Sequence, residues 1–166
     1  MFCALPQRRA LGYTKSAEYT LKRGVTMTCE ELMRDVRKGT AHSIYVLHGE
    51  DAAEVRRSGQ QLAGLLVSEE QAAEGQMLKV SGKWDMEEFR FWLQEIPFLG
   101  GQKWLWWHGC PWLGEAGAEE IAAAAEMVAP WPEYAGLLLT ATKLDKRTRF
   151  YKALVQAGGV EAACAM

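Results

Sequence analysis

The stretch SIYVLHGEDAAE, residues 43–54, decides the fold class of this chain. Its first half is a short apolar run that contains β-branched residues, which is typical of a strand buried on both faces. The run ends at Gly49, and Asp51 with Glu54 three residues later forms a capping box. We predict that this box opens a helix that continues to about residue 67. A buried strand that passes through a glycine turn into a helix is the beginning of an α/β fold.

The same alternation of strand and helix continues on both sides of this stretch. Further helices are predicted at residues 30–38, 85–96, 116–128 and 146–157, and Thr28 with Glu31 forms a capping box at the start of the first of these. Further strands are predicted at residues 76–82, 103–107, 136–141 and 159–165. Short strands separated by longer helices imply right-handed crossovers and a parallel sheet. The sequence therefore predicts one α/β domain with five parallel strands and helices on both faces.

Composition separates a basic amino-terminal segment from an acidic remainder. The 166 residues carry a net charge of −2, yet residues 1–26 hold five basic residues and one acidic residue. We interpret residues 1–26 as a basic arm, either unstructured or upstream of the natural start at Met27, and residues 27–166 as the domain. An acidic domain is not expected to bind nucleic acid strongly by its own surface. No apolar run is long enough for a membrane span.

The four cysteines are scattered along the chain, without a C-x-x-C pair or the spacing of a disulfide framework. We therefore expect a reduced, cytoplasmic setting. His108 and Cys110 lack a second pair of ligands, so no metal site is predicted.

A nucleotide site in this fold would lie at the turn after the first strand. That turn would read G-x-x-x-x-G-K-[ST] in a nucleotide-hydrolysing protein. Here Gly49 is followed by Glu50, Asp51 and Glu54, and Val55 stands where the lysine belongs. Three acidic residues would repel a triphosphate, because such a site needs backbone N–H groups and a cation. The acidic turn is explained fully as a helix cap.

The second requirement for ATP chemistry is an acid that holds Mg²⁺ after the third strand. The sequence there is LWWHGCP, residues 105–111, with no Asp or Glu. We therefore predict no catalytic residues, no cofactor and no metal. The rival hypothesis is a small nucleotide-binding α/β enzyme, which a measurement of ATP binding would distinguish.

An apolar turn, EIPFLGG at residues 95–101, joins a predicted helix to the strand that follows it. A helix normally ends through polar residues, whereas this one continues into Ile96, Pro97, Phe98 and Leu99. Either these side chains fold back into the core or they are exposed for a partner. The residues alone leave both alternatives open.

Three segments together resemble a known family: YVLHGED at 45–51, EIPFLGGQKWLWW at 95–107 and TKLDKRTRFYKAL at 142–154. Their order and spacing are similar to the amino-terminal domain of the bacterial DNA polymerase III delta subunit. That subunit opens the sliding clamp within the clamp loader, and its domain is AAA+-like with a degenerate phosphate loop. The resemblance covers residues 27–166. The family's chains continue into a helical lid domain and a collar domain, and from the resemblance we expect this chain to correspond only to the part before them.

The resemblance implies a role in DNA replication in the bacterial cytoplasm. It assigns clamp binding to Ile96, Pro97, Phe98 and Leu99, in a turn shaped by Gly100 and Gly101. The partners it implies are the sliding clamp (the beta subunit) and the other clamp-loader subunits. The holoenzyme is a DNA-directed DNA polymerase, a nucleotidyltransferase, but the resemblance gives this domain no catalysis of its own. The alternative is an interaction domain with the same fold that contacts some other partner through Phe98 and Leu99.

Two further groups of residues are candidates for contact with DNA. Lys143, Lys146 and Arg147 lie near the start of the last helix, where they are either close to DNA phosphates or simply a solvated face. DNA contact is therefore expected to be weak or indirect. The tryptophans of the third strand are predicted to be core residues, with Trp104 and Trp106 on one sheet face and Trp107 on the other.

Overall fold

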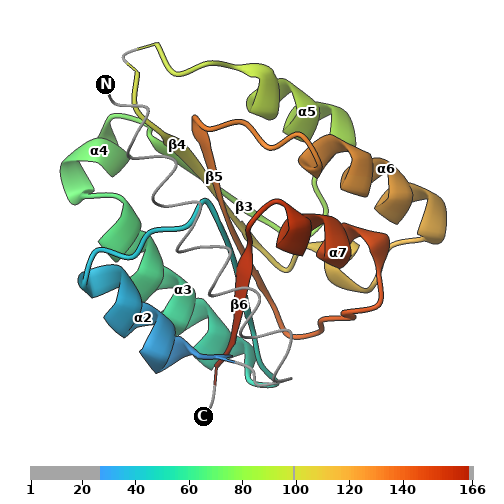
Figure 1. Ribbon diagram of the computed structural model, residues 1–166, viewed down its shortest axis with the longest axis horizontal. Helices are drawn as coiled ribbons and strands as arrows, with labels where there is room; N and C mark the ends of the chain where they lie inside the picture. Colours follow the sequence, from blue (N-terminus) through green and yellow to red (C-terminus); the bar gives the residue numbers. More distant parts are fainter. Residues whose placement is uncertain (1–26, 99, 165–166) are drawn as a thin grey trace.

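The computed structural model describes residues 27–98 and 100–164. In them a parallel sheet lies between two layers of helices (Figure 1). The strands are β1 (Met27–Thr28), β2 (Ile44–His48), β3 (Met77–Ser81), β4 (Lys103–His108), β5 (Ala135–Ala141) and β6 (Val160–Ala163). Their order across the sheet is β1-β6-β2-β5-β4-β3, and all the pairings are parallel. The predicted fold class is confirmed.

The number of strands is corrected from five to six. The additional strand, β1, has only two residues and pairs with Ala162 and Ala163 of β6. Two residues are too few to produce an alternating pattern, so no local pattern predicts this strand.

Two layers of helices cover the sheet. The helices are α2 (Cys29–Arg37), α3 (Ala52–Leu66), α4 (Glu69–Ala73), α5 (Met86–Gln94), α6 (Ala118–Val128) and α7 (Arg149–Gln156), with a 3-10 turn η1 (Pro111–Leu113). Helices α2 and α3 pack on one face, and α5, α6 and α7 pack on the other (Figure 1). The short helix α4, opened by a capping box between Ser68 and Gln71, was not predicted.

The core consists of two clusters, one on each face of the sheet. Leu105 and Trp107 of β4 belong to the cluster under α5, α6 and α7, whereas Trp104 and Trp106 belong to the cluster under α2 and α3. The predicted distribution of these tryptophans is confirmed. Gly136 of β5 makes room for Trp104, because a Cβ at residue 136 would lie 2.4 Å from the indole.

Side-chain caps fix the beginnings of the first two long helices. Thr28 and Glu31 form the predicted capping box, with hydrogen bonds of 3.0 and 3.1 Å. Asp51 accepts hydrogen bonds from the backbone N–H groups of Ala53 and Glu54. The predicted second box is only half formed, because the Glu54 carboxylate pairs with Arg57 instead.

A disulfide joins Cys29, at the start of α2, to Cys164 at the end of β6, with Cα atoms 5.2 Å apart. The expectation of reduced cysteines is therefore wrong for this pair. The two residues are 135 positions apart, and only the pairing of β1 with β6 brings them together. Of the cysteines in the described ranges, Cys110 is free, and it is buried.

Candidate functional site

Helix α5 is held firmly against the sheet by three apolar side chains. Phe89, Trp92 and Leu93 are buried, and Phe89 is part of an aromatic cluster. Its ring centroid lies 6.0 Å from that of Trp107 in β4 and 5.3 Å from that of Trp112. Aromatic pairs at such distances stabilise a core beyond their buried area. The segment that leaves the end of α5 therefore starts from a fixed point.

The carboxyl end of α5 is capped by side chains from elsewhere in the chain. Lys103, the first residue of β4, donates a hydrogen bond from Nζ to the Trp92 carbonyl oxygen. Tyr134 donates from Oη to the Leu93 carbonyl oxygen, at 2.8 Å. Burial lowers the pKa of Lys103, and attraction to Glu95 partly opposes that shift. A cation and a hydroxyl thus satisfy carbonyls that a helix end leaves without partners.

The apolar turn after α5 projects into solvent. Ile96 is 74% exposed and Phe98 is 98% exposed, whereas Pro97 is partly buried. Gly100 donates a backbone hydrogen bond to the Pro97 carbonyl oxygen at 3.2 Å, which closes the turn. Leu99 lies outside the described residues. Of the two alternatives, burial in the protein's own core is excluded for Ile96 and Phe98.

Two consecutive glycines reverse the chain behind Phe98. Gly100 and Gly101 have φ values of 79° and 78°, in the left-handed region that favours glycine. A Cβ at either residue would meet no atom within 4 Å. Glycine is therefore required here by the backbone conformation and not by lack of space.

The turn after β2, where a phosphate loop would lie, is closed by the protein itself. A Cβ on Gly49 would lie 2.5 Å from the Cys164 carbonyl oxygen, so the backbone directly after β6 lies close against this turn. Glu50 is exposed, and Asp51 serves as the cap of α3. These observations agree with the interpretation of the acidic turn as a helix cap.

A buried carboxylate lies beside the same turn. Glu161 of β6 is 6% exposed, and its two oxygens contact His48 Nε2 at 2.6 Å and Lys146 Nζ at 2.7 Å. Burial raises the pKa of Glu161, but the hydrogen bonds from His48 and Lys146 outweigh burial and lower it overall. No motif in the sequence predicted this cluster of Glu161, His48 and Lys146. Its one signal was an acidic residue inside an otherwise apolar strand.

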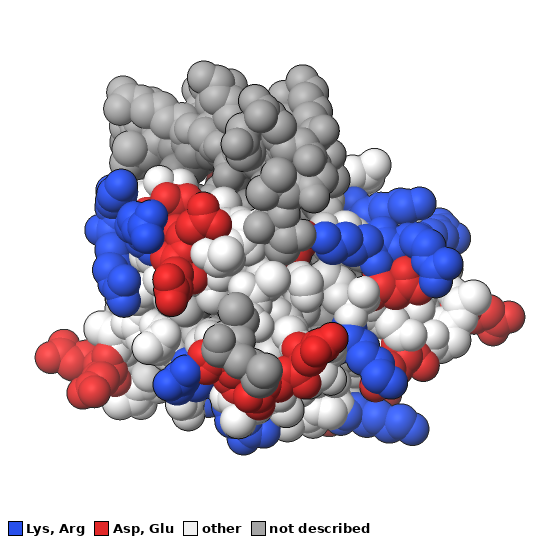
Figure 2. All heavy atoms as spheres, turned by 90° about the horizontal axis from the view of Figure 1, so that it is seen from below, with Lys and Arg blue, Asp and Glu red and all other residues white. Residues whose placement is uncertain are grey.

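The three predicted DNA-facing cations differ in their surroundings. Lys146 is engaged by Glu161, and Arg147 pairs with Asp145 at 3.0 Å. Lys143 is exposed. Figure 2 shows acidic and basic side chains interspersed over this view of the surface instead of gathered into one basic patch. This distribution offers little for binding a polyanion.

The described residues contain neither a metal cluster nor a membrane-spanning helix. The described side chains include no group of three or more His, Cys, Asp or Glu residues arranged to hold a metal ion. In residues 27–98 and 100–164, no helix combines the length and apolar character needed to cross a bilayer.

Comparison with known proteins gives similarity in structure and not in sequence. No family model matches the chain, and no curated protein matches it. The structure is similar to the DNA clamp loader delta protein of Bacillus subtilis, with a TM-score of 0.64, 18% identity, and coverage of 82% of this chain and 42% of that one. It is also similar to a DNA polymerase III gamma subunit-related protein of Thermotoga maritima, with a TM-score of 0.56, 18% identity, and coverage of 84% and 46%.

The chain therefore spans less than half of the length of either structure. It shares its fold with part of a DNA clamp loader delta protein and with part of a DNA polymerase III gamma subunit-related protein.

Proposed function

We propose that this domain binds a sliding clamp through the turn that carries Ile96 and Phe98, and that binding favours the open form of the ring. The observation that carries the proposal is the exposure of Phe98, 98%, on a turn whose base is fixed. Covering an exposed aromatic side chain with a partner is favourable, and central aromatic anchors dominate the energy of many interfaces. The fold, shared with part of a clamp loader delta protein, supports this choice of partner.

The energetics suit a protruding anchor. Burying one such side chain in a pocket contributes about 1.5–3 kcal/mol. The capped end of α5 and the glycine-shaped turn restrict the backbone on both sides of Phe98 before binding, which reduces the backbone freedom lost when the complex forms. Pro97 and Leu99, the second of which lies outside the described residues, stay predicted contacts.

The proposed mechanism involves no bond making or breaking by this domain. A ligand shifts an equilibrium only by its difference in affinity for the two states. The domain would therefore bind the clamp beside a subunit interface more tightly when the ring is open. Other clamp-loader subunits would supply ATP hydrolysis and control access to the turn.

A binding assay with purified sliding clamp tests the proposal. Phe98→Ala is expected to weaken binding at least tenfold, since each tenfold change corresponds to about 1.4 kcal/mol. Leu65→Ala is the matched control, because Leu65 is a partly exposed apolar residue on α3, across the sheet from α5. An unchanged affinity of Phe98→Ala, or no binding by the native domain, would reject the proposal.

Ring opening needs a separate measurement. A clamp labelled with fluorophores across one subunit interface should show increased opening when the native domain is added. Phe98→Ala should open the ring only at correspondingly higher concentration. Tight binding without any change in fluorescence would support clamp binding by this domain but would reject the proposal that binding opens the ring.

A further inference from the structure

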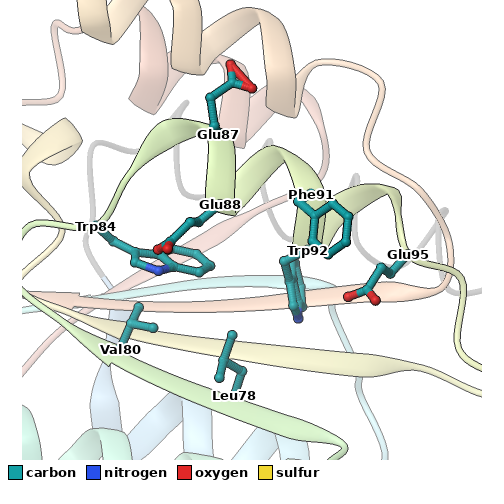
Figure 3. Close-up of a pocket in the computed structure, with 8 residues that line it drawn as sticks. All are labelled: Leu78, Val80, Trp84, Glu87, Glu88, Phe91, Trp92 and Glu95. Carbon is teal, nitrogen blue, oxygen red and sulfur yellow. The ribbon is translucent and has the colours of Figure 1, made fainter.

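A groove of about 500 Å³ lies between strand β3 and helix α5 (Figure 3). Its apolar lining consists of Leu78 and Val80 from β3, Trp84 from the connecting loop, and Phe91 and Trp92 from α5. Phe91 is 67% exposed and Leu78 is 40% exposed, although both are large apolar side chains. The groove is distinct from the turn that carries Phe98, and neither the fold nor the proposed clamp contact accounts for its exposed apolar surface.

Strand β3 is at one edge of the sheet, and no described strand lies beyond it. The Gln76 carbonyl accepts a hydrogen bond from Trp104, and the Gly82 N–H donates one to His108, so these residues face β4. Backbone groups of alternate residues point to opposite edges of a strand. Met77, Lys79 and Ser81 therefore direct their N–H and C=O groups outward. Such an edge is a template for a further strand.

The side chains of β3 place this edge beside the groove. Leu78 and Val80 are in register with Leu105 and Trp107, which belong to the core cluster on the α5 face. Lys79 lies on the opposite face, with Nζ 5.6 Å from the Trp106 ring. A peptide added to β3 would thus direct every second side chain into the groove, next to Leu78 and Val80.

The charged part of the lining is entirely acidic. Glu87, Glu88 and Glu95 line the groove, and no Lys or Arg does so among the described residues. Arg90 pairs with Glu87 at 2.8 Å from outside the groove. A carboxylate rim attracts basic side chains and repels acidic ones. Two copies of this chain joined through their β3 edges would bring the same carboxylates together, which disfavours self-association.

We infer that the groove binds an extended segment of a partner protein as an added strand beside β3. The segment would carry apolar side chains at alternate positions, pointing toward Leu78 and Phe91, and Lys or Arg residues near Glu88 and Glu95. Backbone hydrogen bonds would supply affinity, and the groove with its acidic rim would supply specificity. This inference does not depend on what binds the Phe98 turn.

Three synthetic peptides test it by fluorescence anisotropy against the full chain. The first alternates valine and lysine, the second alternates valine and glutamate, and the third is the first with alternate backbone nitrogens methylated. The valine–lysine peptide is expected to bind at least tenfold more tightly than either of the others, and its affinity should fall as salt is added. Equal binding of the first two peptides would overturn the charge argument. Equal binding of the methylated peptide would overturn strand addition.

Variants of the chain test whether the peptide binds in the groove. Phe91→Lys and Glu88→Lys should each reduce binding of the valine–lysine peptide at least fivefold. Both residues are exposed, so both variants should fold, which circular dichroism checks. Leu65→Lys on α3 is the matched control and should bind normally. Phe98→Ala should also bind the peptide normally, which separates this inference from clamp binding.

The remaining outcomes count against the inference. Failure of the native chain to bind the valine–lysine peptide would reject it, as would unchanged binding by Phe91→Lys. Sedimentation of the native chain as a dimer that Phe91→Lys dissociates would show that a second copy covers the groove, and would reject it as well.

Discussion

Lys103, the first residue of β4, contacts both the backbone and the side chain of Trp92 in the last turn of α5. Its ammonium group donates a hydrogen bond to the Trp92 carbonyl and lies 4.4 Å from the centroid of the Trp92 indole. One side chain thus satisfies a helix-end carbonyl and makes a cation–π contact. This relationship positions the exposed turn, because the turn begins directly after the carbonyls that Lys103 and Tyr134 hold.

We predict that Lys103→Met loosens the end of α5. Methionine keeps most of the apolar stem but loses the charged donor, which lowers the free energy of unfolding by about 1–2 kcal/mol. Backbone amides in residues 95–101 should exchange hydrogen faster, and clamp affinity should fall. Lys79→Met is the control, because Lys79 also lies over an indole, at 5.6 Å from Trp106, but is exposed. Equal exchange of residues 95–101 in both variants would contradict a positioning role for Lys103.

Replacing glycine by alanine is expected to change stability in opposite directions at Gly100, in the turn after α5, and at Gly64, in α3. Gly100→Ala should destabilise the protein by about 1 kcal/mol, because a φ of 79° is strained for alanine. Gly64→Ala, on the exposed side of α3 with no atom within 4 Å of the added Cβ, should stabilise it by about 0.5–1 kcal/mol. Urea unfolding measures both. Stabilisation by Gly100→Ala would show that the turn adopts another conformation.

Glu161→Gln is expected to lower the free energy of unfolding at neutral pH by about 1–3 kcal/mol, because His48 and Lys146 lose their common carboxylate. Glu88→Gln, an exposed carboxylate, is the control and should change little.

The effect of Glu161 should depend on pH in a defined direction. Its pKa in the folded protein lies below the ordinary value of 4.5, so its contribution is present above that value and is lost as pH falls through the folded-state pKa. The stability difference between the native chain and Glu161→Gln should therefore shrink in acid. A difference that stays constant from pH 7 to pH 3 would contradict the assigned ion pairs.

His42 should make stability fall at mildly acidic pH. It is buried beside Tyr45, and burial lowers its pKa from 6.5 to about 4. The unfolded chain therefore binds a proton before the folded one does, and stability falls as pH decreases from 6.5 toward 4. The full loss is about 3–4 kcal/mol, from a shift of about 2.5 pKa units at 1.36 kcal/mol each. In His42→Phe this fall between pH 7 and pH 4.5 should disappear from urea unfolding curves; a fall as steep as in the native chain would assign it to another group.

The disulfide predicts a response to reductant. Breaking the bond between Cys29 and Cys164 should lower the free energy of unfolding by about 2–4 kcal/mol. Thermal unfolding with and without dithiothreitol measures this, and Cys29→Ser with Cys164→Ser should be insensitive. Cys110→Ser is the control. This change removes a thiol that is not in the disulfide, so dithiothreitol should still lower the thermal stability of the variant. An identical response of the double variant and the native chain would argue against the bond.

Local patterns in the sequence predicted much of the fold. The run before Gly49, the capping box of Thr28 and Glu31, and the opposite faces of Trp106 and Trp107 are all confirmed. Each of these features depends on residues within a few positions of one another. Helix caps and strand alternation are set at that range, so a sequence alone reveals them.

The missed features depend on strand order and register, which no local pattern encodes. The contact of Glu161 with His48 requires β6 to lie beside β2, and the groove requires β3 to be an edge strand. The exposure of Phe98 also lay beyond the sequence, because an apolar turn looks the same whether it folds inward or outward. Resemblance to a family favoured the outward arrangement, and the structure places Phe98 in solvent.

The carboxylate of Glu161 occupies the positions that a free anion would need beside Lys146 and His48. It already supplies negative charge to Lys146 and His48 at the end of the sheet where phosphates would otherwise gather. A free phosphate would have to compete with the Glu161 carboxylate, whose local concentration is constant because it is part of the same chain. We therefore expect Lys146 and His48 to stay paired with Glu161 at any concentration of free phosphate, so that the backbone around Glu161 keeps one conformation.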